Sequence, residues 1–290
     1  MDTDALTDWF AGAARDLPWR EPGTTPWGVL VSEVMLQQTP VARVSGVWTE
    51  WMARWPVPSA LAAAVPADVL RAWGRLGYPR RALRLHACAG VLATDHGDTV
   101  PTDLEELLAL PGVGSYTARA LACFAHGQRV PVVDTNVRRV VARAEHGRAE
   151  AGLVSTTRDL ADTEALLPGD VGAAVSVSKA LMELGAVVCT ARAPQCPWCP
   201  VQDGCAWLRL GRPAHTGPRA PGQRFAGTDR QVRGLLMAVL REGSTPLPRA
   251  DLDVVWPQDP AQCDRALGSL LADGLVEQTP RGEFALAGEG

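Results

Sequence analysis

The sequence almost lacks lysine: Lys179 is the only one, so arginine makes up 27 of the 28 basic side chains. Arginine is the better residue for forked contacts to phosphate and for stacking on bases. A basic excess, which proteins that coat nucleic acid usually carry, is also missing, since the formal net charge is −4. The charge therefore argues against non-specific coating of nucleic acid and leaves local contacts through arginine open.

Long apolar runs are absent as well, and none is long enough to cross a bilayer. The acidic start Met1-Asp2-Thr3-Asp4 is unlike a charged-then-apolar leader. We therefore expect a soluble, cytoplasmic protein without a membrane partner. With 290 residues, 47% of them hydrophobic, the chain can bury a substantial core.

Convincing period-two alternation is missing before residue 220, whereas apolar residues recur at helical spacing, as in Leu104, Leu107 and Leu108. Proline and glycine interrupt this pattern often, which predicts many short helices. A linker rich in Gly, Pro and Arg follows at 211–227. The tail, 228–290, predicts three helices and then a small hairpin, which is the outline of a winged-helix module.

Four of the seven cysteines lie in one short window, as Cys189-x6-Cys196-x2-Cys199-x5-Cys205. Four thiolates in one loop suit a zinc ion or an iron–sulfur cluster. Zinc sites tend to have two CxxC knuckles held apart, whereas this loop contains a single CxxC. The spacing therefore favours one [4Fe-4S] cluster over zinc. The other three cysteines are scattered and are best interpreted as small core residues.

A glycine turn, Leu110-Pro111-Gly112-Val113-Gly114-Ser115-Tyr116, follows a leucine-rich helix. Two glycines spaced two apart let the backbone turn sharply and approach a ligand, and the next helix then presents unpaired N–H groups. Such a turn predicts a phosphate cradle, and the alternative is a helix–helix corner.

Two acidic residues are candidates for catalysis. Glu33 lies inside the apolar segment Val31–Leu36, where burial should raise its pKa and make it a proton donor. Asp134 ends the run Val132-Val133 and precedes Thr135-Asn136. It can cap the next helix, and an anion held there can face a developing cation.

Together these motifs resemble the helix-hairpin-helix DNA glycosylases of the endonuclease III superfamily, and within it the MutY-type adenine glycosylases. The cysteine spacing, the Leu-Pro-Gly-Val-Gly hairpin and the setting of Glu33 carry the resemblance from about Trp9 to Cys205. It implies an all-α bilobed glycosylase with a [4Fe-4S] loop in residues 1–210, followed by the winged-helix-like module. The implied lobes are a helical barrel with the hairpin, at about 24–133, and an iron–sulfur lobe of 1–23 plus 134–210.

The resemblance also implies roles for single residues. Glu33 would protonate adenine and Asp134 would stabilise the sugar cation, with Tyr116 and Asn136 orienting this pair. The implied DNA contacts are Gln38 and Leu36, as a wedge on the loop after the catalytic helix, Trp19 and Arg20 before it, and the hairpin residues Gly112, Val113, Gly114 and Ser115.

The implied activity is base excision repair: hydrolytic removal of adenine mispaired with 8-oxoguanine or guanine in double-stranded DNA, by a monomer associated with the nucleoid. Lyases of the superfamily place a nucleophilic lysine where this chain has Tyr116. Because Lys179 is the only lysine and belongs to the segment before the cysteine loop, we expect a monofunctional enzyme.

Three features depart from the resembled family: Thr135 replaces a usual glycine, Pro79 replaces a common second tyrosine, and the tail lacks the nudix-like domain that reads 8-oxoguanine. Two alternatives remain open at this point. One is a thymine, uracil or oxidised-pyrimidine glycosylase on the same scaffold, and the other is an iron–sulfur transcription regulator with a winged-helix tail.

Overall fold

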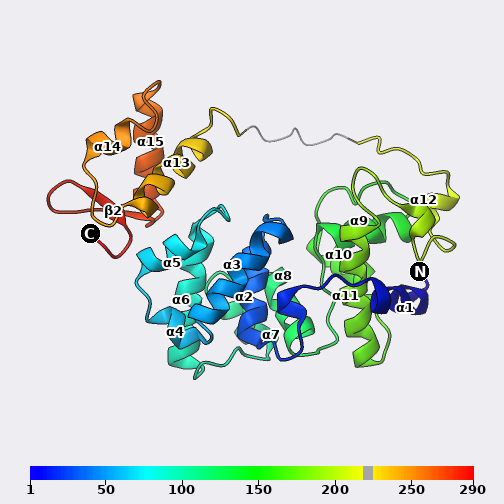
Figure 1. Cartoon of the computed structure of the whole chain (residues 1–290). Coiled ribbons are helices and arrows are strands. Elements are labelled where there is room, and N and C mark those ends of the chain that lie inside the picture. The colour runs from blue at the N-terminus through cyan, green and yellow to red at the C-terminus, as the bar shows by residue number, and fades with distance from the viewer. Residues whose placement is uncertain (218–224) are drawn as a thin grey trace. The chain divides into compact units, whose positions relative to one another are not determined.

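The structure is a computed structural model that describes residues 1–217 and 225–290. It is mostly helical, with a single small sheet of two strands among the described residues (Figure 1). None of the described helices is long and apolar enough to span a membrane. The predicted linker, 211–227, lies partly outside the described residues. The predicted boundaries of the two lobes stay a prediction.

The described residues form two compact units. The first unit contains residues 1–30, 101–109 and 113–217, and the second contains 31–100, 110–112 and 225–290. Helix α2 (Pro26–Leu36) begins in the first unit and ends in the second.

The other helices of the first unit are α1 (Thr3–Ala13), η1 (Pro18–Arg20), α7 (Leu104–Ala109), α8 (Ser115–Ala120), η2 (Leu121–Ala125), α9 (Thr135–Ala144), α10 (Thr156–Glu164), α11 (Val171–Val187), η3 (Cys196–Trp198) and α12 (Ala206–Arg209). The second unit has α3 (Val41–Arg54), α4 (Pro58–Ala62), α5 (Pro66–Trp73), α6 (Arg80–Asp95), α13 (Asp229–Glu242), α14 (Arg249–Asp253), α15 (Pro260–Ala272), β1 (Val276–Gln278) and β2 (Phe284–Leu286).

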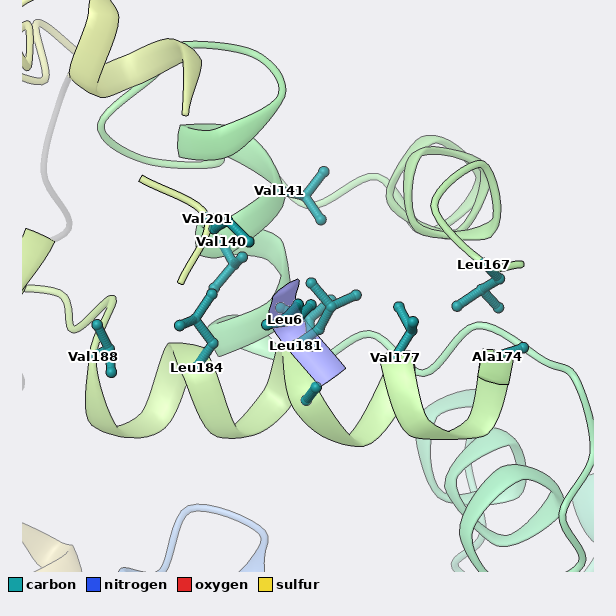
Figure 2. Close-up of a cluster of buried hydrophobic side chains, with 12 residues drawn as sticks. Leu6, Val140, Val141, Leu167, Ala174, Val177, Leu181, Leu184, Val188 and Val201 are labelled. Atoms are coloured by element: carbon teal, nitrogen blue, oxygen red, sulfur yellow. The ribbon is translucent and has the colours of Figure 1, made fainter. Parts of the chain in front are cut away.

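The core of the first unit is built on one apolar face of α11. Its buried side chains recur every three or four residues and pack against α9 and α1, as Figure 2 shows for Ala174, Val177, Leu181, Leu184 and Val188. Val140 and Val141 of α9 face this row. This packing fixes α9, which carries Asp134 at its start, against the helix that leads into the cysteine loop.

A buried ion cluster ties the N-terminal segment to α11. The Glu183 carboxylate is fully buried and accepts from Arg15 Nε at 2.6 Å and from Arg20 NH2 at 2.9 Å. Burial pushes the pKa of Glu183 up, but the hydrogen bonds and charges of the two arginines outweigh burial and hold that pKa below its usual value. The segment around Trp19 is therefore anchored from inside the unit.

The C-terminal module, residues 228–290, has the element order that the sequence predicts. Helices α13, α14 and α15 are followed by the antiparallel pair β1–β2, with Val276 opposite Leu286. Leu247, between α13 and α14, forms an additional antiparallel bridge to Phe284. Leu236 of α13 and Leu270 of α15 are fully buried.

Candidate functional site

Asp134 is the N-cap of α9, as the sequence allowed. Its Oδ1 accepts from the Val137 backbone N–H at 2.7 Å, and its Oδ2 accepts from Asn136 Nδ2 at 2.7 Å. Burial raises the pKa of Asp134, while these two donors lower it, and burial outweighs them. The donors at the helix N-terminus favour the ionised carboxylate, as expected, but their effect on the pKa is smaller than that of burial.

Asn136 is held in turn by Arg139, one helical turn further along α9. Arg139 NH2 donates to Asn136 Oδ1 at 2.8 Å and to the Gly185 carbonyl at 2.6 Å. Its Nε donates to the carbonyl of Cys189 at 2.7 Å. A continuous hydrogen-bonded chain therefore joins the Asp134 carboxylate to the backbone of the first cysteine of the loop.

Gly185 allows α11 to pass close enough to α9 for this chain to form. A Cβ at this position would lie 2.7 Å from Asn136 Cβ and 2.9 Å from the Asn136 carbonyl oxygen. Any side chain here would push Asn136 away from Asp134, so the close helix crossing requires glycine.

All four cysteines of the loop line one open hollow, together with Arg143 and Trp207. Among the described residues, no three Cys, His, Asp or Glu side chains converge tightly enough to hold a single metal ion. Burial raises the pKa of Cys199 to about 11, so a bound cationic group is needed to stabilise its thiolate.

Arg143 braces this loop from α9. Its NH1 donates to Cys189 Sγ at 3.4 Å and to the Thr190 carbonyl at 2.8 Å, and its guanidinium lies 4.7 Å from the centre of the Trp207 ring. Asn136, Arg139 and Arg143 recur every three or four residues, so one face of α9 contacts both Asp134 and the cysteine loop.

Glu33 is buried in α2, 7% exposed, as its apolar neighbours predicted. Leu36 is the last residue of α2, so its predicted place on the following loop is wrong by one residue. The helix ends here because Pro40, four residues later, has no N–H to donate to the Leu36 carbonyl. Gln38 is exposed and has a left-handed backbone, with φ of 56°.

The hairpin has the backbone that its glycines predict. Gly112 has φ of 79°, and a Cβ there would lie 2.9 Å from Arg84 Cβ. Gly114 is extended and is the N-cap of α8, which has six residues and continues into η2. Ser115 is exposed, Val113 is buried, and Tyr116 packs against Cys123 and its neighbours.

Trp19 and Arg20, whose contact with DNA stays a prediction, lie in the segment before α2. Trp19 is 8% exposed, and the Arg20 guanidinium binds Glu183. The ion pair of Arg20 with Glu183 anchors the segment that precedes α2.

Comparison with known proteins shows which family has this sequence and fold. Residues 31–160 match the model of the HhH-GPD superfamily of base excision DNA repair proteins. Over 289 residues the chain is 64% identical to an adenine DNA glycosylase of Mycobacterium tuberculosis, covering 100% of this chain and 94% of that one. The chain belongs to the adenine DNA glycosylase family.

Solved structures of other DNA glycosylases have the same fold and support this family assignment. A thermostable thymine-DNA glycosylase aligns with a TM-score of 0.65 at 26% identity, covering 72% of this chain and 95% of that one. Endonuclease III trapped on DNA aligns at 0.62 with 25% identity, covering 72% and 94%. The glycosylase therefore acts in base excision repair, and the regulator alternative is set aside.

Arg139 and Gly185 of the glycosylase are functional positions that sequence reasoning missed. Arg139 follows Asn136 by three residues on a helix, so its place on the same face was a usable signal. Gly185 lies within an apolar helix, where an isolated glycine costs stability and often marks close packing.

We predict that Asn136→Ala moves the acidic limb of the pH–rate profile to higher pH. Losing the donor to Oδ2 removes one cause that lowers the pKa of Asp134, so that pKa rises further, and the ionised form is lost at higher pH as the solution is acidified. Single-turnover rates measured across acidic and neutral pH check this. An unchanged limb with a uniformly lower rate would contradict it, and Gln258→Ala, at an exposed position between α14 and α15, is the control.

Proposed function

We propose that the enzyme removes adenine opposite guanine or 8-oxoguanine in duplex DNA by hydrolysis and stops at the abasic site. The observation that carries the proposal is the anchored Asp134 carboxylate, in a chain that matches an adenine DNA glycosylase from end to end. The buried acid Glu33 supplies the second group that excision needs.

In this mechanism the target adenine leaves the stack and enters the site. Glu33 donates its proton to the purine ring, the N-glycosidic bond breaks, and the bonding electrons leave with the base. The sugar is then an oxocarbenium-like cation. Shielding of Glu33 from water inside α2 suits a proton donor.

Asp134 faces that cation as an anion until water adds to the sugar. Both of its oxygens accept from fixed donors, so the charge needs no reorganisation as the cation develops. Asp134 is largely shielded from water, so the effective dielectric around it is low. Its attraction to the sugar cation at close range is therefore stronger than it would be in water. Tyr116 and Asn136 are the proposed orienting residues.

No lysine stands where a lyase would need one. Tyr116 occupies the hairpin position of the nucleophile, and Lys179 lies on α11 and faces Cys123 closely enough to influence its pKa. Without a Schiff base, the strand stays intact after the base is lost.

The proposed DNA contacts divide into two groups. Gly112, Val113, Gly114 and Ser115 form the phosphate-binding turn, supported by the left-handed Gly112 and the exposed Ser115. Leu36 and Gln38, at the end of α2, are the proposed wedge. Trp19 and Arg20 stay further proposed contacts, with Arg20 held by Glu183, and the enzyme works as a monomer.

The four-cysteine hollow fits one [4Fe-4S] cluster. Its residues would be Cys189, Cys196, Cys199 and Cys205, which line one hollow together, and their spacing, with a single CxxC, favours a [4Fe-4S] cluster over a zinc ion. Hydrolysis moves no electrons, so the cluster would brace the loop. The C-terminal module, with a third strand contact at Leu247, has the element order of a winged helix.

A single-turnover assay on duplexes with adenine opposite 8-oxoguanine, guanine or thymine tests the function. We expect strand breaks only after alkali and only at mispaired adenine, and their loss in Glu33→Gln, since removing a general acid costs about 10²- to 10⁴-fold. Glu50→Gln, exposed on α3, is the matched control. Breaks without alkali would contradict the monofunctional reaction, and release of thymine or oxidised pyrimidine alone would contradict adenine excision.

Removing one cysteine ligand tests the cluster. Cys199→Ser should lower the iron content from about four atoms per chain, remove the brown colour and lower the thermal stability. Cys263→Ser, in the core of the C-terminal module, should keep the iron. Stoichiometric zinc in the unaltered protein, or full iron in Cys199→Ser, would contradict the assignment.

A further inference from the structure

The C-terminal module docks on α5 within the second unit through two arginines that cap each other's helices. Arg71 of α5 donates to the carbonyl of Gly243 at 2.8 Å and to that of Arg241 at 3.3 Å, at the end of α13. Arg241 of α13 donates back to the Leu70 carbonyl at 3.1 Å, in the last turn of α5. Cations at helix C-termini stabilise carbonyls that lack a partner within the helix.

The last residues of the described chain strengthen this contact. The Glu289 carboxylate accepts hydrogen bonds from both terminal nitrogens of Arg71, at 2.5 and 2.9 Å, in a forked ion pair. Beside it, a Cβ on Gly288 would lie 3.0 Å from Pro66 Cδ, so the chain end packs tightly on the start of α5. The module and α5 therefore share an interface with several directed hydrogen bonds and a forked ion pair.

The module also contacts the turn between α5 and α6. Arg230 NH1 lies 3.1 Å from Tyr78 Oη, and the Arg230 guanidinium is 5.6 Å from the centre of that ring. Asp273 lies 3.2 Å from Arg80 NH1. Tyr78 has φ of 47°, a left-handed backbone that a tyrosine rarely adopts, so contacts from outside the turn help to hold it.

The same turn is joined to α2 through Arg81. This buried guanidinium stacks over Tyr78 and Trp73, with centroid distances of 5.8 and 5.0 Å. Its NH1 donates to the carbonyls of Val34 and Met35 at 2.8 and 3.0 Å. Burial lowers the pKa of Arg81 to about 10, which leaves it charged at neutral pH. Arg81 thereby fixes the last turn of the helix that carries Glu33.

The charge of the module argues against its reading DNA directly. Residues 228–290 hold six arginines and ten acidic side chains. On α15, which would be the recognition helix of a winged-helix reader, Arg265 lies near Asp229 at 3.7 Å, and Asp264 pairs with Arg249. A DNA-reading helix presents unpaired basic and amide groups instead.

We infer that the C-terminal module is a fixed positioning element of the catalytic body, which holds the Tyr78 turn through Arg230 and, by way of Arg81, the end of α2. The inference rests on the proposed function of Glu33 and of the α2 end. In this role the module changes the rate of base excision and does not itself recognise DNA.

The test uses Arg230→Gln and Glu289→Gln in the full chain, with exposed Arg281→Gln as the control. We expect about a fivefold slower single-turnover excision in each test variant, the scale of one lost hydrogen bond or cation–π contact, with unchanged affinity for matched duplex. Hydrogen exchange of residues 74–81 should become faster in both test variants and stay unchanged in Arg281→Gln.

Excision and exchange rates equal to those of the unaltered chain would overturn the inference. So would a uniform loss of affinity for all duplexes with a shallower salt dependence, since that identifies Arg230 as a phosphate contact. If the unaltered chain releases no adenine, the proposed function fails, and the exchange of residues 74–81 still decides whether the module holds the turn.

Discussion

The hydrogen bonds that Arg139 donates to Asn136, Gly185 and Cys189 are the constraint on which the site of the first unit depends. They fix the orientation of the amide that holds Asp134, and they attach that amide to the backbone of the cysteine loop. A hydrolase has no need of electron transfer, so the proposed use of the cysteine loop is to hold the backbone to which the proposed catalytic carboxylate is tied. The positions of Cys189 and Asp134 are linked through these hydrogen bonds.

Arginine in this protein binds backbone carbonyls inside the fold as well as offering charge at the surface. Arg81, Arg139, Arg143 and Arg241 each donate to carbonyls at helix ends or in loops. A planar fork with five donors suits this task, and a lysine could not replace it. The use of arginine to bind carbonyls inside the fold therefore explains part of the scarcity of lysine.

Much of the fold followed from the sequence. Helical periodicity predicted the short helices, and the motifs around Glu33, Gly112, Asp134 and the four cysteines identified the family. Periodicity and spacing report local structure, however, so they could not show that Arg20 turns inward to Glu183 or that α11 crosses α9 at Gly185. Those facts depend on contacts between residues far apart in the chain, as does the docking of the module on α5.

A double-mutant cycle on Asn136→Ala and Arg139→Lys tests the central claim most directly, with the single-turnover rate of adenine excision as the readout. If both residues act through one chain to Asp134, the double variant should be about as slow as the slower single variant, with a coupling energy above about 0.5 kcal/mol. Losses that simply add would show that Arg139 supports the cysteine loop without acting on the carboxylate, and would contradict the account.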